Sequence, residues 1–380
     1  MTGTSTARPL RWARRNLFAN PLDGALSLVV VPTALWLIYA LSVWVFRDAH
    51  WSVLGDSMRV MMVGTYPADA MWRAWTAALV LTVLSGATVG VVVDDGPVAL
   101  LAAAAIGTLT CVTLLVGGDF ADAAWTAACA VGGLGGWILT ARLPAARRAL
   151  PAAWLVGFTL ACGVFAGPGF DAWGGLLLSV ILTIAVSALT LPLGVILALG
   201  RRSRIASLRV CCTAYIEIFR AVPLILVVYW IWIVVPLLLP GLSVSGVVRG
   251  VLGYTVFFCA YVAEYVRSGL QAVPRGQVEA ARSLGMGTWT LNTQIVLPQA
   301  IKVVIPALVG NVLDIFNAAT LVFIIGLTDF LRAGQMILAD PRFGNLTYEV
   351  YAFLFLVYFA IGSLITFTAR SLEGRLASGR

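Results

Sequence analysis

The side chains that most often do chemistry are scarce in this sequence of 380 residues. His50 is the only histidine, so a histidine-based metal centre or proton relay has almost no groups to use. The six cysteines lie in or beside apolar segments without a C-x-x-C pair, which is typical of small buried side chains. Lys302 is the only lysine and follows Ile301, whereas the phosphate-binding loop of ATPases needs a glycine before its lysine. We therefore expect no metal, no cofactor and no enzymatic site in this chain.

The densest polar pattern is EAARSLGMGTWTLNTQIVLP, at residues 279–298. Residues 276–284 are rich in helix formers, and a helix of that length spans about 13 Å at 1.5 Å per residue. Pro274 is suited to the start of such a helix, and Gly285 is suited to the left-handed conformation that ends one. The pattern predicts a short, sharply bounded helix.

Four residues of this helix indicate that it contacts another protein. Glu279 and Arg282 are three residues apart, so they share one face and can make polar contacts there. Ala280 and Ala281 are small enough to let a partner surface approach the backbone.

Polar residues also occur inside an apolar segment near the carboxyl-terminal end. Asp314 lies twelve residues after Lys302, or about 18 Å into a helix that enters the membrane there. Asn311, Asp314 and Asn317 follow at intervals of three, and Thr320 continues the series. Such a stripe must face protein or water, because a charge near the bilayer centre costs about 3 kcal/mol. We expect it either to line a pathway for a polar substrate or to form hydrogen bonds between helices.

Two acid–base pairs are spaced for contact within a helix. Glu217 and Arg220 are three residues apart, as are Glu264 and Arg267, so each pair can form an ion pair near the cytoplasmic face. The first pair is a candidate gate or latch, or an interfacial ion pair worth about 0–1 kcal/mol. The second lies just before the polar loop at 270–298 and is expected to brace that loop.

The composition is that of a membrane protein. Hydrophobic residues make up 61% of the chain and charged residues 11%, against roughly 25% in soluble domains. Ten apolar segments are long enough to cross a hydrocarbon core of about 30 Å. They lie near 25–46, 76–93, 97–117, 123–141, 151–167, 173–199, 219–239, 246–266, 301–327 and 349–369.

The basic residues predict the orientation of these spans. With ten spans and a cytoplasmic amino terminus, 19 of the 25 Lys and Arg residues fall inside and six outside. The six are Arg47, Arg59, Arg73, Arg249, Arg332 and Arg342. We therefore expect both termini, and residues 279–298, to be cytoplasmic.

The Gly/Pro-rich stretch at 167–172 divides the chain into an amino-terminal and a carboxyl-terminal half. We expect a basic cytoplasmic segment at 1–24, an amino-terminal transmembrane extension of about five spans at 25–170, and a five-helix core at 171–373. A cytoplasmic loop at 270–298 lies within that core. The predicted fold class is an all-α polytopic membrane protein of about ten transmembrane helices.

The spacing of Glu279-Ala280-Ala281, Gly285, Ile295 and Leu297-Pro298 resembles the EAA loop of bacterial ABC-importer permeases, EAA-x3-G-x9-I-x-LP. Residues 173–373 as a whole resemble the polar amino-acid family of these permeases, in the segments 178–203, 215–227, 261–286 and 321–331. The preceding spans resemble the extended permeases of general L-amino-acid importers, through the sequence VGTYP at 63–67.

This resemblance implies a permease that translocates polar amino acids across the bacterial inner membrane by alternating access. It implies partners: a dimer of ATPase subunits that hold ATP and Mg²⁺, a homologous permease or a second copy of this chain, and an extracytoplasmic solute-binding protein. The EAA loop would be the coupling helix, and its residues Glu279, Ala280, Ala281, Arg282 and Gly285 would contact the ATPase.

The sequence departs from the family in one place. The family often has K-D-T-S-L where this chain has Asn317-Ala318-Ala319-Thr320-Leu321, so the charged pair is missing. Asp314, one turn earlier, can replace the acid, but nothing replaces the lysine. Two other classes remain open: an ion-coupled secondary transporter of small polar solutes, which would explain Asp314, and a membrane scaffold. Neither explains the spacing at 279–298.

Overall fold

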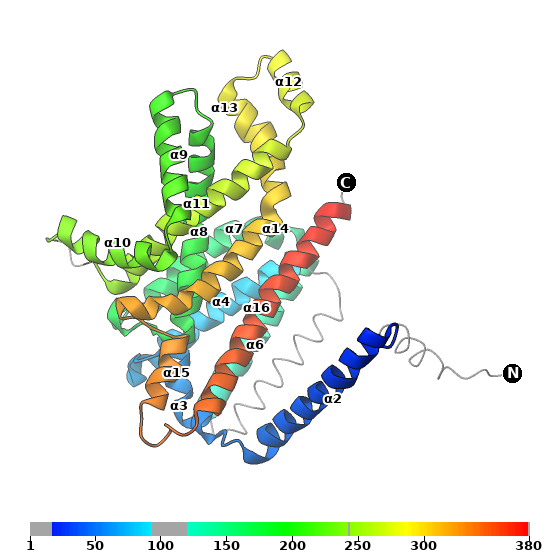
Figure 1. Cartoon of the computed structure of the whole chain (residues 1–380). Helices are drawn as coiled ribbons and strands as arrows, with labels where there is room; N and C mark the ends of the chain where they lie inside the picture. Colours follow the sequence, from blue (N-terminus) through cyan, green and yellow to red (C-terminus); the bar gives the residue numbers. More distant parts are fainter. Residues whose placement is uncertain (1–16, 93–119, 242–243, 379–380) are drawn as a thin grey trace. The chain divides into compact units, whose positions relative to one another are not determined.

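The computed structural model describes residues 17–92, 120–241 and 244–378, in two compact units divided after Trp51. Its described residues are almost entirely helical (Figure 1). Eight of the described helices are long and apolar enough to cross a membrane, or nine if one bent pair counts as a single span. The predicted all-α membrane fold is confirmed. The span expected at 97–117 lies outside the described residues.

The first unit contains one long helix. Helix α2, Pro21–Val43, begins with a proline in the first turn, where the missing N–H would have no intrahelical partner, and has a second proline, Pro32, in its interior. It continues into a π-helical turn, Trp44–Asp48, and together they form the first candidate span. The ring of Trp44, at the start of this turn, meets the ring of Trp51, which follows the turn, edge to face with their centroids 5.7 Å apart.

The second unit holds the remaining described helices, whose bounds follow in chain order. They are α3 (Ser52–Val63), α4 (Met71–Val92), α6 (Phe120–Arg142), α7 (Pro144–Phe165), α8 (Gly175–Arg201), α9 (Ala206–Ala221), α10 (Leu224–Leu238), α11 (Gly246–Ala272), α12 (Arg275–Ser283), α13 (Thr288–Thr290), α14 (Leu297–Ala318), α15 (Phe330–Leu338) and α16 (Thr347–Ser378). A π-helical turn, Leu291–Val296, leads into α14, and a 3-10 segment, Ala319–Ile325, follows it. Helices α3 and α15 lie between the apolar spans expected from the sequence, in segments for which no helix was predicted.

The predicted span at 219–239 is not a single straight helix. Helices α9 and α10 meet at an angle of 113°. The break falls at Pro223, which lacks an N–H and pushes the preceding residue out of helical geometry. Val222 is accordingly extended, with φ −96° and ψ 139°. The expectation of one continuous helix over 219–239 was therefore wrong: its first residues belong to α9 and most of the rest to α10.

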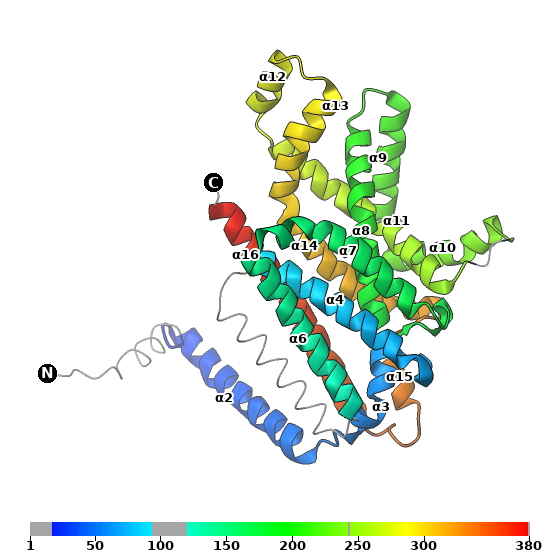
Figure 2. The same cartoon turned by 180° about the vertical axis from the view of Figure 1, so that it is seen from behind.

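Helices α4, α6 and α7 pack side by side (Figure 2). Glycines let α4 and α6 come very close: a Cβ added to Gly136 would lie 2.3 Å from the Val83 carbonyl oxygen. The Thr140 hydroxyl donates a 2.7 Å hydrogen bond to the Ala87 carbonyl across the same interface. Small residues and interhelical hydrogen bonds of this kind hold helices together where the hydrophobic effect cannot.

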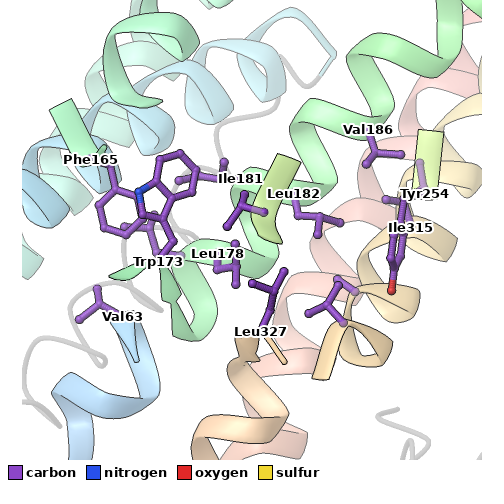
Figure 3. Close-up of a cluster of buried hydrophobic side chains, with 14 of the residues drawn as sticks. Val63, Phe165, Trp173, Leu178, Ile181, Leu182, Val186, Tyr254, Ile315 and Leu327 are labelled. Atoms are coloured by element: carbon purple, nitrogen blue, oxygen red, sulfur yellow. The ribbon is translucent and has the colours of Figure 1, made fainter. Parts of the chain in front are cut away.

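The amino-terminal helices share a buried cluster with the later ones. Figure 3 shows Val63 at the end of α3 and Phe165 at the end of α7 in one cluster with side chains of α8. Tyr254 of α11 and Ile315 of α14 belong to the same cluster. The buried Tyr66 side chain stacks on Phe165 at 4.6 Å and donates a 2.8 Å hydrogen bond to the Phe165 carbonyl. The second unit therefore has a core to which both halves of the sequence contribute.

Three segments cross at one end of this core. Gly174 and Gly175 pair with the two-residue strand β1, Thr328–Asp329, and the backbone of Gly64 lies against them. A Cβ on Gly64 would lie 2.8 Å from the Gly174 Cα, so only glycine fits this crossing. Asp329 is fully buried there and caps the amino terminus of α15.

Candidate functional site

Helix α12 and the turn after it form the most sharply bounded polar element of the chain. The helix runs from Arg275 to Ser283, so it begins and ends one residue earlier than the predicted 276–284. Pro274 is its amino-terminal cap. At the other end Gly285 has a φ of +74°, in the left-handed region. The Gly285 N–H bonds the Arg282 carbonyl and the Met286 N–H bonds the Ala281 carbonyl. These two bonds form a Schellman motif, so the predicted role of Gly285 as terminator is confirmed.

The two faces of α12 have different surroundings. Glu279, Ala280 and Arg282 are exposed. Ala281, by contrast, is 5% exposed and packs in a cluster with Leu291 and Val296 of the π-helical turn. The expectation that Ala281 lies on a partner-facing surface was therefore wrong: in a short helix, adjacent residues point about 100° apart, and here Ala281 points inward.

Helix α12 lies at one end of the second unit, and α3 and α15 lie at the opposite end (Figures 1 and 2). Leu284 and Trp289, which follow α12, are 82% and 77% exposed. The end that carries α12 therefore offers polar and apolar side chains together, as protein-binding surfaces do.

Five charged side chains gather below α12, at the ends of α8, α9 and α11. Glu264 accepts a 2.7 Å hydrogen bond from Arg267 Nε, and it lies 3.3 Å from Arg201 and 3.7 Å from Arg220. Glu217 is bonded to Arg201 at 2.8 Å.

The Glu264–Arg267 pair is formed as the spacing predicted. The Glu217–Arg220 pair is not: the two side chains turn to Arg201 and Glu264, which other helices bring near. Sequence spacing reveals only local partners, and Arg201, at the end of an apolar segment, carried no signal beyond its charge.

The predicted polar stripe on α14 is divided by the fold. Asn311 is 4% exposed and lies inside the helix bundle, whereas Asp314 and Asn317 are exposed. Thr320 is the second residue of the 3-10 segment and donates a 2.8 Å hydrogen bond to the Asn317 carbonyl. The expectation of one stripe with one environment was therefore wrong for Asn311.

Asn317 lines a cleft of about 480 Å³ between α14 and α16. Leu313, Ser363, Thr366 and Arg370 also line it, so its wall is mixed apolar and polar. Among the residues that the structure describes, no group of three His, Cys, Asp or Glu side chains is placed to hold a metal ion. The cleft between α14 and α16 thus offers polar contacts, through Asn317, Ser363 and Arg370, to a protein or a solute.

Comparison with known proteins adds a family match. Residues 190–378 match the family model described as "Binding-protein-dependent transport system inner membrane component". The chain is 31% identical, over 400 aligned positions, to the inner membrane amino-acid ABC transporter permease protein YhdY of Escherichia coli K12, covering 99% of this chain and 95% of the relative.

Two further relatives match to different extents. The glutamate/glutamine/aspartate/asparagine transport system permease protein BztC of Rhodobacter capsulatus is 28% identical, over 97% of this chain and 93% of its own length. The glutamate/aspartate import permease protein GltK of Escherichia coli O157:H7 is 32% identical, over 53% of this chain and 92% of its own. A solved structure, "Crystal structure of an amino acid ABC transporter with histidines", is 30% identical over 53% of this chain and 92% of that chain, with a TM-score of 0.48.

Proposed function

This chain belongs to the binding-protein-dependent transport system inner membrane components, the permease subunits of ABC importers, and we propose that it carries polar amino acids. The substrate class is supported by the names of YhdY, BztC and GltK, all of them amino-acid permeases. The chain does no covalent chemistry. Its helices expose the solute first to one side of the inner membrane and then to the other.

The observation that carries the coupling role is the form of α12. A short helix with a Schellman motif at its end and with Glu279, Ala280 and Arg282 exposed presents a rigid surface to a partner. Ala281 anchors it to the π-helical turn that leads into α14. A push on α12 therefore reaches α14, the helix that holds Asp314. We assign α12 to the groove of an ATPase subunit that binds ATP and Mg²⁺.

The partners follow from this assignment. A dimer of ATPase subunits binds the cytoplasmic end, and a homologous permease or a second copy of this chain completes the pathway. A solute-binding protein delivers the solute at the opposite end, where α3 and α15 lie. Both termini are then cytoplasmic, in agreement with the distribution of Lys and Arg residues.

Co-purification tests the coupling assignment. The Glu279→Lys variant reverses the charge of the exposed face of α12 and should lose most of the ATPase subunit that co-purifies with the wild-type chain. Glu373→Lys makes the same change at an exposed residue of α16 and serves as the matched control. Equal retention of the ATPase by both variants and the wild type would contradict the proposal.

The exposed Asp314 and Asn317 are the proposed pathway residues of this chain. A charge in the middle of a span must meet water, solute or a partner subunit rather than lipid. Asp314→Asn should lower ATP-driven uptake about tenfold or more, since a hydrogen bond to a charged group contributes about 1.5–3 kcal/mol. Assembly with the ATPase should be unchanged. Asp340→Asn, in the segment between α15 and α16, is the control; unaltered uptake in Asp314→Asn would leave that residue a structural role only.

A further inference from the structure

A cleft of about 400 Å³ opens between the end of α8 and the last turns of α11. Its walls are Arg201 and Arg202 on one side and Glu264, Arg267 and Gln271 on the other. Figure 1 shows these helices close together. The cleft lies outside α12 and outside the α14 stripe, and the transport mechanism proposed above does not use it.

The cleft carries an excess of positive charge. Three arginines against one glutamate leave it with a formal charge of +2. Glu264 is already shared, because Arg201, Arg220 and Arg267 all lie within 3.7 Å of its carboxylate. Arg202 is exposed, and within the described part of the chain no hydrogen bond or ion pair is formed by its guanidinium. An anion entering the cleft would therefore meet an unengaged arginine beside two partly engaged ones.

The position of the cleft selects the kind of anion. Arg201 is the last residue of the candidate span Gly175–Arg201, and Arg267 and Gln271 lie in the last two turns of the span Gly246–Ala272. Where two spans end together, the surrounding layer is that of the lipid headgroups. Ile205 and Leu208, directly after the cleft in the sequence, are 62% and 44% exposed and offer apolar contact.

We propose that this cleft binds the phosphate of an anionic phospholipid, with Arg202 as its main ligand and Arg201 and Arg267 at its sides. One guanidinium group can donate two parallel hydrogen bonds to two oxygens of a phosphate. Basic pockets between membrane helices bind anionic lipid headgroups. The alternative is that these arginines only interact favourably with the dipoles of the helices that they end, a role that needs no bound ligand. The proposal rests on the chain spanning a membrane and is independent of the transported solute.

Native mass spectrometry of the full chain in detergent tests this proposal. The wild type, Arg202→Gln and Arg204→Gln are each titrated with phosphatidylglycerol, phosphatidylethanolamine and inorganic phosphate. Arg204 is the matched control, since it is exposed and two residues away but does not line the cleft. Because Arg202 has no partner among the described side chains, its replacement removes only its interaction with the dipole of α8 and should change the thermal unfolding midpoint only slightly.

The expected result is selective binding of phosphatidylglycerol by the wild type. Arg202→Gln should weaken it about fivefold, as expected for one arginine near a charged membrane surface. Arg204→Gln should stay within about twofold of the wild type. Equal binding of the two lipids, or an equal loss in both variants, would overturn the proposal. Inorganic phosphate that displaces the lipid completely would show a small-anion site instead and would also overturn it.

Discussion

At the scale of single residues, Asp329 is a carboxylate in an unusual environment. Its carboxylate is fully buried at the crossing of β1 with Gly174 and Gly175, and it accepts hydrogen bonds from the Leu331 and Arg332 N–H groups at 2.9 and 3.2 Å. Burial raises the pKa of Asp329 to about 6, although these bonds favour the charged form. The folded chain therefore holds this proton more tightly than the unfolded chain.

The raised pKa predicts how stability depends on pH. Between about pH 4 and 6 the folded state keeps a proton that the unfolded state has lost, so the free energy of unfolding should fall as the pH rises. The loss from this residue is on the order of 3 kcal/mol. Asp329→Asn keeps a capping side chain and should remove most of this slope when thermal unfolding in detergent is followed from pH 4 to 8.

Asp340 provides the control for this measurement. Arg342 holds the pKa of Asp340 below its ordinary value, so its contribution is lost only at lower pH, and the sign is opposite. Asp340→Asn should therefore keep the slope of the wild type between pH 4 and 6. A slope that is equally steep in Asp329→Asn and in the wild type would contradict the assignment to Asp329.

Residues differ in how far the sequence alone could place them. Gly285 was predictable, because a glycine after a run of helix formers has one common role. Glu264 and Arg267 were predictable as a pair, because both belong to one helix. The partners of Glu217 and Arg220 were not, since they depend on how α8, α9 and α11 meet in space. Asp329 gave no signal, because burial at a chain crossing leaves no local pattern.

At the scale of elements, the interface between α4 and α6 makes a specific prediction. Gly136→Ala would bring a Cβ to 2.3 Å from the Val83 carbonyl oxygen, so the helices must separate. Overpacking of this kind costs about 1–3 kcal/mol. The variant should lower the thermal unfolding midpoint of the chain in detergent.

The neighbouring glycine is the matched control. A Cβ on Gly135 meets no atom within 4 Å, so Gly135→Ala adds only helix propensity, which favours the helix by up to about 1 kcal/mol. It should leave the midpoint unchanged or raise it slightly. A loss of stability in Gly135→Ala as large as that in Gly136→Ala would show that the close packing of α4 and α6 is not the cause.

Elements were predictable where their composition was uniform. Long apolar runs located the spans, and helix formers bounded by Pro274 and Gly285 located α12. The break between α9 and α10 was missed, because a hydropathy pattern does not show where the chain turns from one helix direction to another. Pro223 was its one local signal. Helices α3 and α15 were missed because each is short and only one face is buried, against partners distant in the sequence.

At the scale of the whole molecule, helices from the beginning, middle and later part of the second unit contribute side chains to one hydrophobic core. YhdY and BztC match this chain over nearly its full length, whereas GltK matches about half of it. The full length of this chain is therefore matched by some relatives and only part of it by others. In this chain Val63, Tyr66 and Phe165 pack in one cluster with α8, α11 and α14, so α3, α7 and the segment after α3 are part of the core of the second unit.

Uptake into proteoliposomes that contain the assembled complex tests the central claim most directly. With ATP on the side of α12, the wild type should accumulate a polar amino acid, and Glu279→Lys should reduce this uptake to near background while Glu373→Lys does not. An ion gradient without ATP should drive none. Accumulation that an ion gradient drives in the wild type, or ATP-driven uptake that Glu279→Lys leaves intact, would contradict the account.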